Sequence, residues 1–176
     1  MKATGVVRRI DDLGRIVLPK ELRRTMRIKE GESLEIYTDG DNKIVLKKYS
    51  PVNQMTDFVK EFTESMFTTN KRNIIITDNE KIVAASGEFK KDITGSKITK
   101  DLEERLKNRN TQINNNGVTL SICDDYTITK SSIIKPINVF GDILGCVIVE
   151  GAPNITEVEK SLAEFGGLFM SRYLEI

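Results

Sequence analysis

The first fifty residues combine short apolar runs with turn residues at regular intervals. Residues 5–10 and 15–18 are rich in valine and isoleucine and are separated by Asp11 and Asp12, which predicts two short strands joined by a turn. Pro19 suits the first position of a helix, where its missing N–H has no intrahelical partner to lose. In order, the predicted elements are strands at 5–10 and 15–18, a helix at about 20–27, and strands at 33–38 and 43–48, the last two joined by the turn signal Asp-Gly-Asp-Asn.

A different pattern begins at residue 55, where apolar side chains recur at helical spacing. The side chains on this face are Met55, Phe58, Val59, Phe62 and Met66. The elements predicted after this helix are a hairpin at 73–78 and 81–86, a helix at 98–107, strands at 118–123, 132–138 and 142–150, and a long helix at 155–173. Thr156 and Glu159 form the sequence signature of a capping box for the last helix. This order favours an α+β fold with an antiparallel sheet covered by helices.

Ser50 and Pro51 mark the boundary between the two patterns. Proline disfavours helix at the residue before it and breaks a continuing strand. We therefore expect an N-terminal domain at 1–50, a linker at 51–54 and a second domain at 55–176. Because about fifty residues bury little surface, the first domain is expected to dimerise, with strands exchanged or interleaved between two chains.

Composition and charge narrow the classes of function. The chain has 27 Lys and Arg against 26 Asp and Glu, but residues 1–50 hold 12 basic side chains against 8 acidic ones, so the basic surplus is local. The absence of histidine excludes Ser-His and Cys-His catalysis and most zinc sites, and no phosphate-binding glycine loop is present. Two distant cysteines, Cys123 and Cys146, and the lack of an apolar N-terminal signal core lead us to expect a cytoplasmic protein with no metal, no cofactor and no membrane partner.

The predicted helix at 20–27 separates charged from apolar side chains. At 100° per residue, Leu22 and Met26 share one face. Three arginines lie on another face, and the helix does not neutralise their charge internally: Arg23, Arg24 and Arg27.

Two interpretations of this basic face stay open. A run of charge is often only a solvated surface. Arginine rather than lysine favours nucleic acid, because its planar fork fits phosphates and guanine edges. Arg8 and Arg15 lie in the same small unit, and a dimer would double every charge.

The stretch at 3–49, "ATGVVRRIDDLGRIVLPKELRRTMRIKEGESLEIYTDGDNKIVLKKY", closely resembles the AbrB-type swapped-hairpin DNA-binding domain of spore-forming bacteria. The resemblance implies an obligate dimer, a β-barrel of interleaved hairpins that binds double-stranded DNA through arginines. Met26 replaces a more usual leucine, a change that conserves volume. Carried over position by position, the DNA contacts are Arg8, Arg15, Arg23 and Arg24. The charge argument adds weaker candidates, Arg9, Lys20 and Arg27.

The second domain resembles a GAF domain by the order and size of its elements. Apolar residues in the last helix step by three and four residues, which is typical of a helix-pairing seam but also of a core-facing stripe. These residues are Ile155, Val158, Leu162, Phe165 and Phe169. A small-molecule pocket could be edged by Gly87, Gly95 or the polar stretch 108–117, although each also fits an ordinary loop, and the ligand is not identified.

These observations lead us to expect a DNA-binding transcription regulator and not an enzyme. The resemblance implies a forespore regulator, associated with the nucleoid, that activates and represses late sporulation genes. Its GAF-like domain would mediate oligomerisation, as a dimer or a tetramer built from two dimers, and would sense a ligand. Three alternatives remain: a module whose basic face binds an acidic protein, a protein-binding module of the antitoxin type, and a GAF-fold redox enzyme that uses Cys123 or Cys146.

Overall fold

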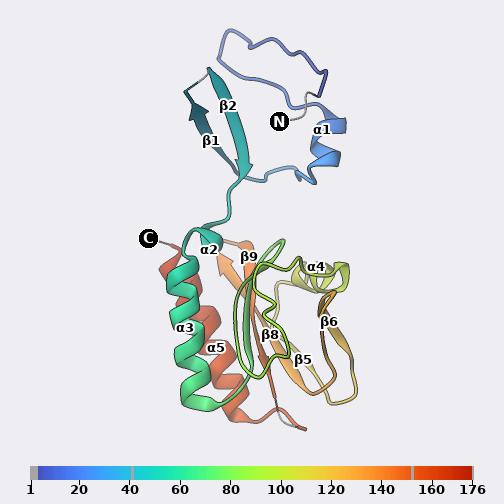
Figure 1. The fold of residues 1–176 in the computed structure, drawn as a ribbon, viewed down its shortest axis with the longest axis vertical. Helices are drawn as coiled ribbons and strands as arrows, with labels where there is room; N and C mark the ends of the chain where they lie inside the picture. Colours follow the sequence, from blue (N-terminus) through green and yellow to red (C-terminus); the bar gives the residue numbers. More distant parts are fainter. Residues whose placement is uncertain (1–3, 41, 152, 176) are drawn as a thin grey trace. The chain divides into compact units, whose positions relative to one another are not determined.

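The computed structural model describes residues 4–40, 42–151 and 153–175. The chain divides into two units, unit 1 at Met1–Tyr49 and unit 2 at Ser50–Ile176. Figure 1 shows the elements of each unit along the chain. We describe the two units separately.

Unit 1 contains a short helix, α1 (Lys20–Thr25), and a hairpin of two strands, β1 (Leu34–Asp39) and β2 (Lys43–Lys48). The antiparallel register pairs Leu34 with Lys48 and Asp39 with Lys43. The helix ends because Arg27 adopts a left-handed backbone at φ 53°, and the N–H of Ile28 closes back on the carbonyl of Arg23 at 2.8 Å. The predicted helix and hairpin are therefore present, with the helix two residues shorter than expected.

The strands predicted at 5–10 and 15–18 are not formed in the described residues of a single chain. The turn between them is present, because the N–H of Gly14 bonds to the carbonyl of Asp11 and the N–H of Asp11 bonds to the carbonyl of Arg15, each at 3.0 Å. A strand needs a neighbour to satisfy its backbone groups, and one chain supplies none here. The apolar side chains that the pattern assigned to these strands are exposed, Val7 by 86% and Val17 by 74%.

Unit 2 is built on a five-stranded antiparallel sheet in the order β4-β3-β9-β8-β5. Its strands are β3 (Ile74–Asp78), β4 (Ile82–Ser86), β5 (Gln112–Asn114), β8 (Ser132–Val139) and β9 (Asp142–Glu150), and a separate hairpin is formed by β6 (Leu120–Cys123) and β7 (Tyr126–Ile128). Its helices are α2 (Pro51–Gln54), α3 (Thr56–Asn70), α4 (Lys100–Leu106) and α5 (Glu157–Tyr173). The predicted elements of this part are all present, whereas β5 and β7 were not predicted. Residues 51–54, expected as a linker, form α2 and bury Val52 completely.

Two apolar clusters cover the two faces of this sheet. On one face, Ile74 and Ile76 of β3 pack in the cluster that includes α3 and α5 residues, and the two helices lie side by side (Figure 1). On the other face, Ile75 packs with residues of α4 and of the β6–β7 hairpin. Alternation along β3 sends neighbouring isoleucines to opposite clusters, so a strand buried on both faces reads as a continuous apolar run.

Helix α5 is fixed at both its start and its middle. The Thr156 side chain caps its first turn, and Glu159 returns a hydrogen bond to the Thr156 backbone N–H at 2.8 Å, completing the predicted capping box. Further along, a Cβ on Gly167 would overlap the aliphatic chain of Lys135, and one on Gly166 would lie 3.2 Å from Met66 and Val147. The two glycines therefore permit the helix to lie close to the sheet.

None of the helices in the described part of the chain is long and apolar enough to cross a membrane.

Candidate nucleic-acid interface

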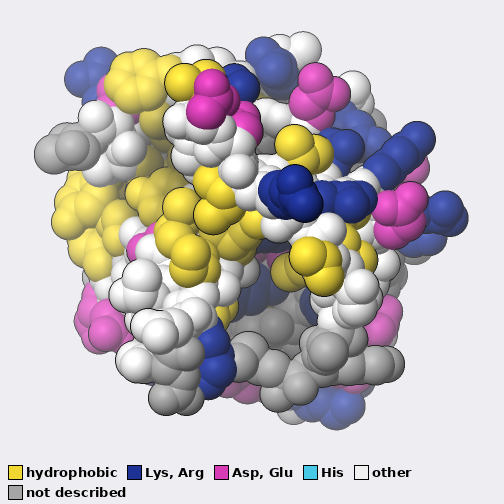
Figure 2. Space-filling view, turned by 90° about the horizontal axis from the view of Figure 1, so that it is seen from above, with side chains coloured by type: hydrophobic (Ala, Val, Ile, Leu, Met, Phe, Trp, Pro, Cys, Tyr) yellow, Lys and Arg dark blue, Asp and Glu magenta, His cyan; other side chains and the backbone are white. Residues whose placement is uncertain are grey.

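The basic residues predicted to meet DNA all lie in unit 1. Arg24 projects from α1 and is exposed, as are the arginines of the preceding segment, Arg8, Arg9 and Arg15. Lys20 begins α1, and Arg27 follows it in the left-handed position that ends the helix; both are exposed. In the face seen in Figure 2, Lys and Arg side chains lie at the surface next to exposed apolar ones.

Helix α1 supplies the two adjacent arginines of the interface. Arg23 is half-buried, and its Nε is buried without a hydrogen-bond partner among the described residues. Glu21 lies three residues before Arg24, yet the described part of the chain contains no ion pair between them. The charge on this short helix is thus available to an external anion, and a phosphate oxygen could satisfy a donor that is otherwise unsatisfied.

Arg15 differs from the other arginines because it has a carboxylate partner. Its Nε lies 2.8 Å from Oδ2 of Asp11, and its backbone N–H donates to Oδ1 of Asp11 at 2.7 Å. The backbone N–H and then the guanidinium of Arg15 hold the pKa of Asp11 below its ordinary value. The sequence analysis treated Arg15 as one more positive charge and missed this pair. The available signal was the four-residue spacing of the two residues across a turn.

The β1–β2 hairpin divides its side chains between an apolar and a charged face. Ile36 pairs with Leu46 across the strands, and Ile36 is 67% exposed. The other face carries opposite charges at facing positions, Glu35 with Lys47 and Asp39 with Lys43. Pro19 is the one buried residue among all those described in unit 1. Unit 1 therefore has no core of its own in a single chain.

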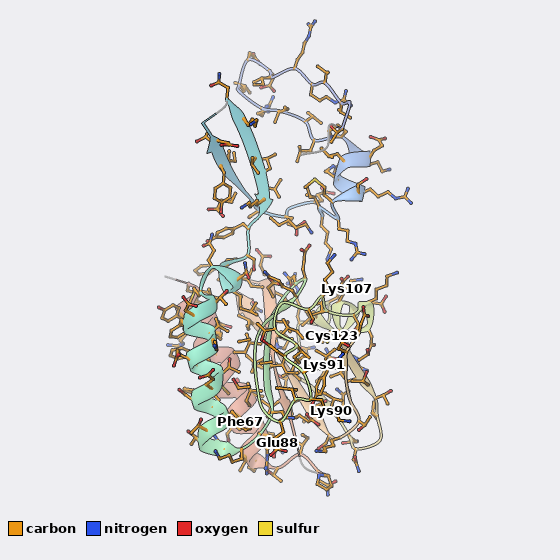
Figure 3. All side chains as sticks on the ribbon, in the orientation of Figure 1. Phe67, Glu88, Lys90, Lys91, Lys107 and Cys123 are labelled. Atoms are coloured by element: carbon orange, nitrogen blue, oxygen red, sulfur yellow. The ribbon has the colours of Figure 1, made fainter. Side chains whose placement is uncertain are left out.

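The glycine candidates in unit 2 have local structural roles. A Cβ on Gly87 would overlap the side chain of Asn73, whose Oδ1 accepts from the N–H of Glu88 at 2.9 Å and whose Nδ2 donates to Glu150 at 2.9 Å. Glu88 begins the connection between β4 and α4 (Figure 3). Gly95 turns the chain at φ 81°. The third candidate, the stretch 108–117, contributes residues 109–111 to a groove described below.

Both cysteines are unsuited to thiolate chemistry. Cys123 ends β6 (Figure 3) and is 1% exposed, and Cys146 is fully buried in β9. Burial raises the pKa of the Cys146 thiol to about 12, despite a contact of 3.3 Å with the Thr77 hydroxyl. A nucleophilic cysteine needs a thiolate near neutral pH, so the geometry gives no support to a redox enzyme.

The predicted seam of α5 is split between two environments. Leu162 is buried against the sheet, whereas Val158 and Phe165 are 45% and 56% exposed. Between α3 and α5 the aromatic rings stack in a continuous row, with centroids 4.6 Å apart for Phe58 and Tyr173. The members of this row, called the aromatic row below, are Phe58, Phe62, Phe165, Phe169 and Tyr173. The stripe thus serves both as core and as surface.

Comparison with known proteins adds the family. Residues 54–175 match the family model described as "Stage V sporulation protein T C-terminal, transcription factor", and residues 7–54 match the one described as "Antidote-toxin recognition MazE, bacterial antitoxin". The chain is 37% identical over 177 residues to stage V sporulation protein T of Bacillus subtilis (strain 168), covering 99% of each protein. It is 63% identical over 51 residues to transition state regulatory protein AbrB of the same organism, covering 29% of this chain and 52% of that relative.

A solved structure supports the fold of the second part. The blue-light absorbing form of the Thermosynechococcus elongatus PixJ GAF domain is similar with a TM-score of 0.50 and 12% identity, covering 72% of this chain and 90% of that one, which shows the fold alone. The fold and the matches define a transcription factor with an AbrB-type first domain and a GAF-like second domain. Its particular place is clear from the full-length match: the chain belongs to the stage V sporulation protein T family. That family consists of transcription factors, so the expectation of a regulator rather than an enzyme is confirmed.

Proposed function

We propose that the protein binds double-stranded DNA as a dimer through unit 1, and that it regulates late sporulation genes in the forespore cytoplasm, activating some and repressing others. The observation that carries this proposal is the 63% identity of 51 residues to a transition state regulator, in a chain that matches a sporulation transcription factor over its full length. The proposed contacts are Arg8, Arg15, Arg23 and Arg24, with Arg9, Lys20 and Arg27 in supporting positions.

Exposed apolar side chains support a dimer of unit 1. Val7, Leu13 and Val17 are each at least 70% exposed, and the apolar face of the β1–β2 hairpin is open as well. Burial of apolar surface releases about 25 cal/mol per Å², and a second copy carries the same unsatisfied strands. Strands contributed by two chains would give segments 5–10 and 15–18 the partners that one chain lacks.

The proposed readout is electrostatic docking combined with recognition of groove shape. Four arginines per chain on a small scaffold suit phosphates and groove edges, and they are too few for a long base-specific code. Arg15 would exchange its exposed ion pair with Asp11 for a phosphate, at little energetic loss because exposed ion pairs contribute about 1 kcal/mol or less.

Unit 2 would link these dimers into a larger assembly and sense a ligand. The aromatic row exposes part of Phe165 and Tyr173, and pairing of α3–α5 surfaces from two chains would bury them. A tetramer made of two dimers would raise DNA affinity through effective concentration.

The match to an antitoxin family favours one alternative, in which unit 1 accompanies a segment that wraps a toxin. Such a role requires a disordered acidic tail, whereas residues 51–176 in the described ranges carry two buried apolar clusters. Competition with bulk non-specific DNA distinguishes the two functions, because a complex with a protein partner should survive it.

Salt titration of DNA binding tests the proposal. If each of the four arginines of two chains met one phosphate, log affinity would fall with log salt at a slope of about −7, and the double variant R23A/R24A should weaken binding and reduce the slope by about 3 to 4. Fluorescence anisotropy of a labelled duplex measures both quantities. K90A is a matched control, because Lys90 is an exposed cation on the connection between β4 and α4 (Figure 3). A flat salt response with intact binding would contradict the proposal.

A further inference from the structure

A groove of about 480 Å³ lies in unit 2 between α5, β8 and the segment that leads into β5. It exists because β5 pairs with β8 only from Ser132 to Ile134, whereas β8 continues to Val139. Before β5 the chain leaves the sheet edge at Arg109, which has a positive φ of 24°. The groove is thus a product of the three-residue length of β5, and its size falls in the range of small-molecule sites.

The floor of the groove is preformed. The aliphatic chain of Lys135 crosses Gly167, where any Cβ would displace it, and its Nζ reaches Oε2 of Glu164 at 2.7 Å. Ser171 accepts from the N–H of Asn138 at 3.1 Å and so joins α5 to the end of β8. These contacts hold the walls together without any ligand.

The charges that remain after this pairing favour an anion. Lys135 and Glu164 neutralise each other, which leaves Arg109 and Arg172 against Glu175. Among the described residues, neither of these two guanidinium groups makes a hydrogen bond or an ion pair. Two free planar forks at one groove are suited to a carboxylate or phosphate group, and Glu175 limits the net charge to one positive unit.

The groove also offers an apolar contact and neutral hydrogen-bonding groups. Leu168 projects from α5 with 49% of its side chain exposed, and Pro136 forms part of the opposite wall. Thr111 adds an exposed hydroxyl. A ligand with an acidic group at one end and a small apolar body at the other would match both sets of contacts.

We propose that this groove binds a small organic anion, a phosphate ester or carboxylate, with its acidic group between Arg109 and Arg172 and its apolar part against Leu168. This inference deepens the sensing role given to unit 2 in the proposed function. The aromatic row occupies a separate set of α5 residues, so the same helix would carry the ligand site and the proposed pairing surface.

The test is a titration of the full chain at physiological ionic strength, followed by amide chemical shifts in nuclear magnetic resonance spectra. Phenyl phosphate and benzoate are the two probes, and they distinguish a phosphate site from a carboxylate site; benzyl alcohol is the neutral control. Saturable shifts at groove residues with one or both anions, and none with benzyl alcohol, are expected. No DNA is present, so a failure here leaves the DNA-binding proposal untouched.

Variants then locate the site. R109A/R172A should weaken anion binding at least tenfold, and L168W, which fills the groove without removing charge, should weaken it comparably. K90A should bind as the unaltered protein does. The absence of saturable shifts, equal affinity in R109A/R172A, or an equal loss in K90A would each overturn the proposal.

Discussion

Replacement of Glu159 by glutamine should destabilise unit 2 by roughly 3 kcal/mol at neutral pH. The Glu159 side chain is fully buried, and its Oε1 lies 2.5 Å from Nε of Arg72, a residue 87 positions away. Burial acts to raise its pKa, but hydrogen bonds from Thr156 and Arg72 outweigh this effect and lower the pKa from 4.5 to about 2. A shift of that size corresponds to about 3 kcal/mol at 1.36 kcal/mol per pKa unit, which agrees with the loss of 3 to 5 kcal/mol typical of a broken buried ion pair.

The same link predicts a dependence on pH. Because the folded-state pKa is lowered, the stabilisation by Glu159 is complete above the unfolded pKa of 4.5 and is lost as the pH falls through about 2. The difference in unfolding free energy between the natural protein and E159Q should therefore shrink across that interval.

Urea denaturation followed by far-ultraviolet circular dichroism is a suitable assay, since α3 and α5 contain most of the helical residues. E157Q is the matched control, because Glu157 lies on the same turn but is 84% exposed and its pair with Lys160 is a surface one. E157Q should change stability by less than about 0.5 kcal/mol. If E159Q were also within that limit, the proposed anchoring of α5 to the start of β3 would be refuted.

Three further predictions concern packing, reactivity and assembly. G145A should destabilise the protein by several kcal/mol or prevent folding, because its Cβ would overlap the backbone of β3; thermal denaturation measures this. Cys123 and Cys146 should react with a thiol reagent only at the rate of unfolding, and fast labelling of the native protein would contradict their burial. F165D should lower the assembly state seen in sedimentation while leaving helicity unchanged, since Phe165 is 56% exposed; an unchanged sedimentation coefficient would count against pairing through the aromatic row.

Periodic patterns predicted the parts of the fold whose stabilisation is local or repeated. The helical spacing after residue 55 and the Thr156 capping signature identified α3 and α5, and the apolar runs identified the central strands. The strands β5 and β7 have three residues each, too few to show an alternation, and they form because neighbouring strands offer backbone partners. Residues 5–10 show the reverse case, in which a clear strand pattern in one chain has no strand to pair with.

The candidate site followed the same division. Sequence reasoning located the arginines of unit 1, since charge is read directly from the residues. The pairing of Asp11 with Arg15 required the geometry of the turn. The groove beside Arg109 and Arg172 depends on where β5 ends, and no spacing between residues 109 and 172 could indicate it.

The absence of a core in unit 1 has a consequence for biosynthesis. Unit 1 precedes unit 2 along the chain, so its valine- and isoleucine-rich stretches leave the ribosome first, with Pro19 the one buried residue among those described. Unit 2 can complete its two clusters on a single nascent chain, whereas unit 1, if paired as proposed, must wait for a second polypeptide. Neighbouring ribosomes on one messenger would shorten that wait, so the speed of translation and the crowding of nascent chains would govern how much regulator matures and how much aggregates.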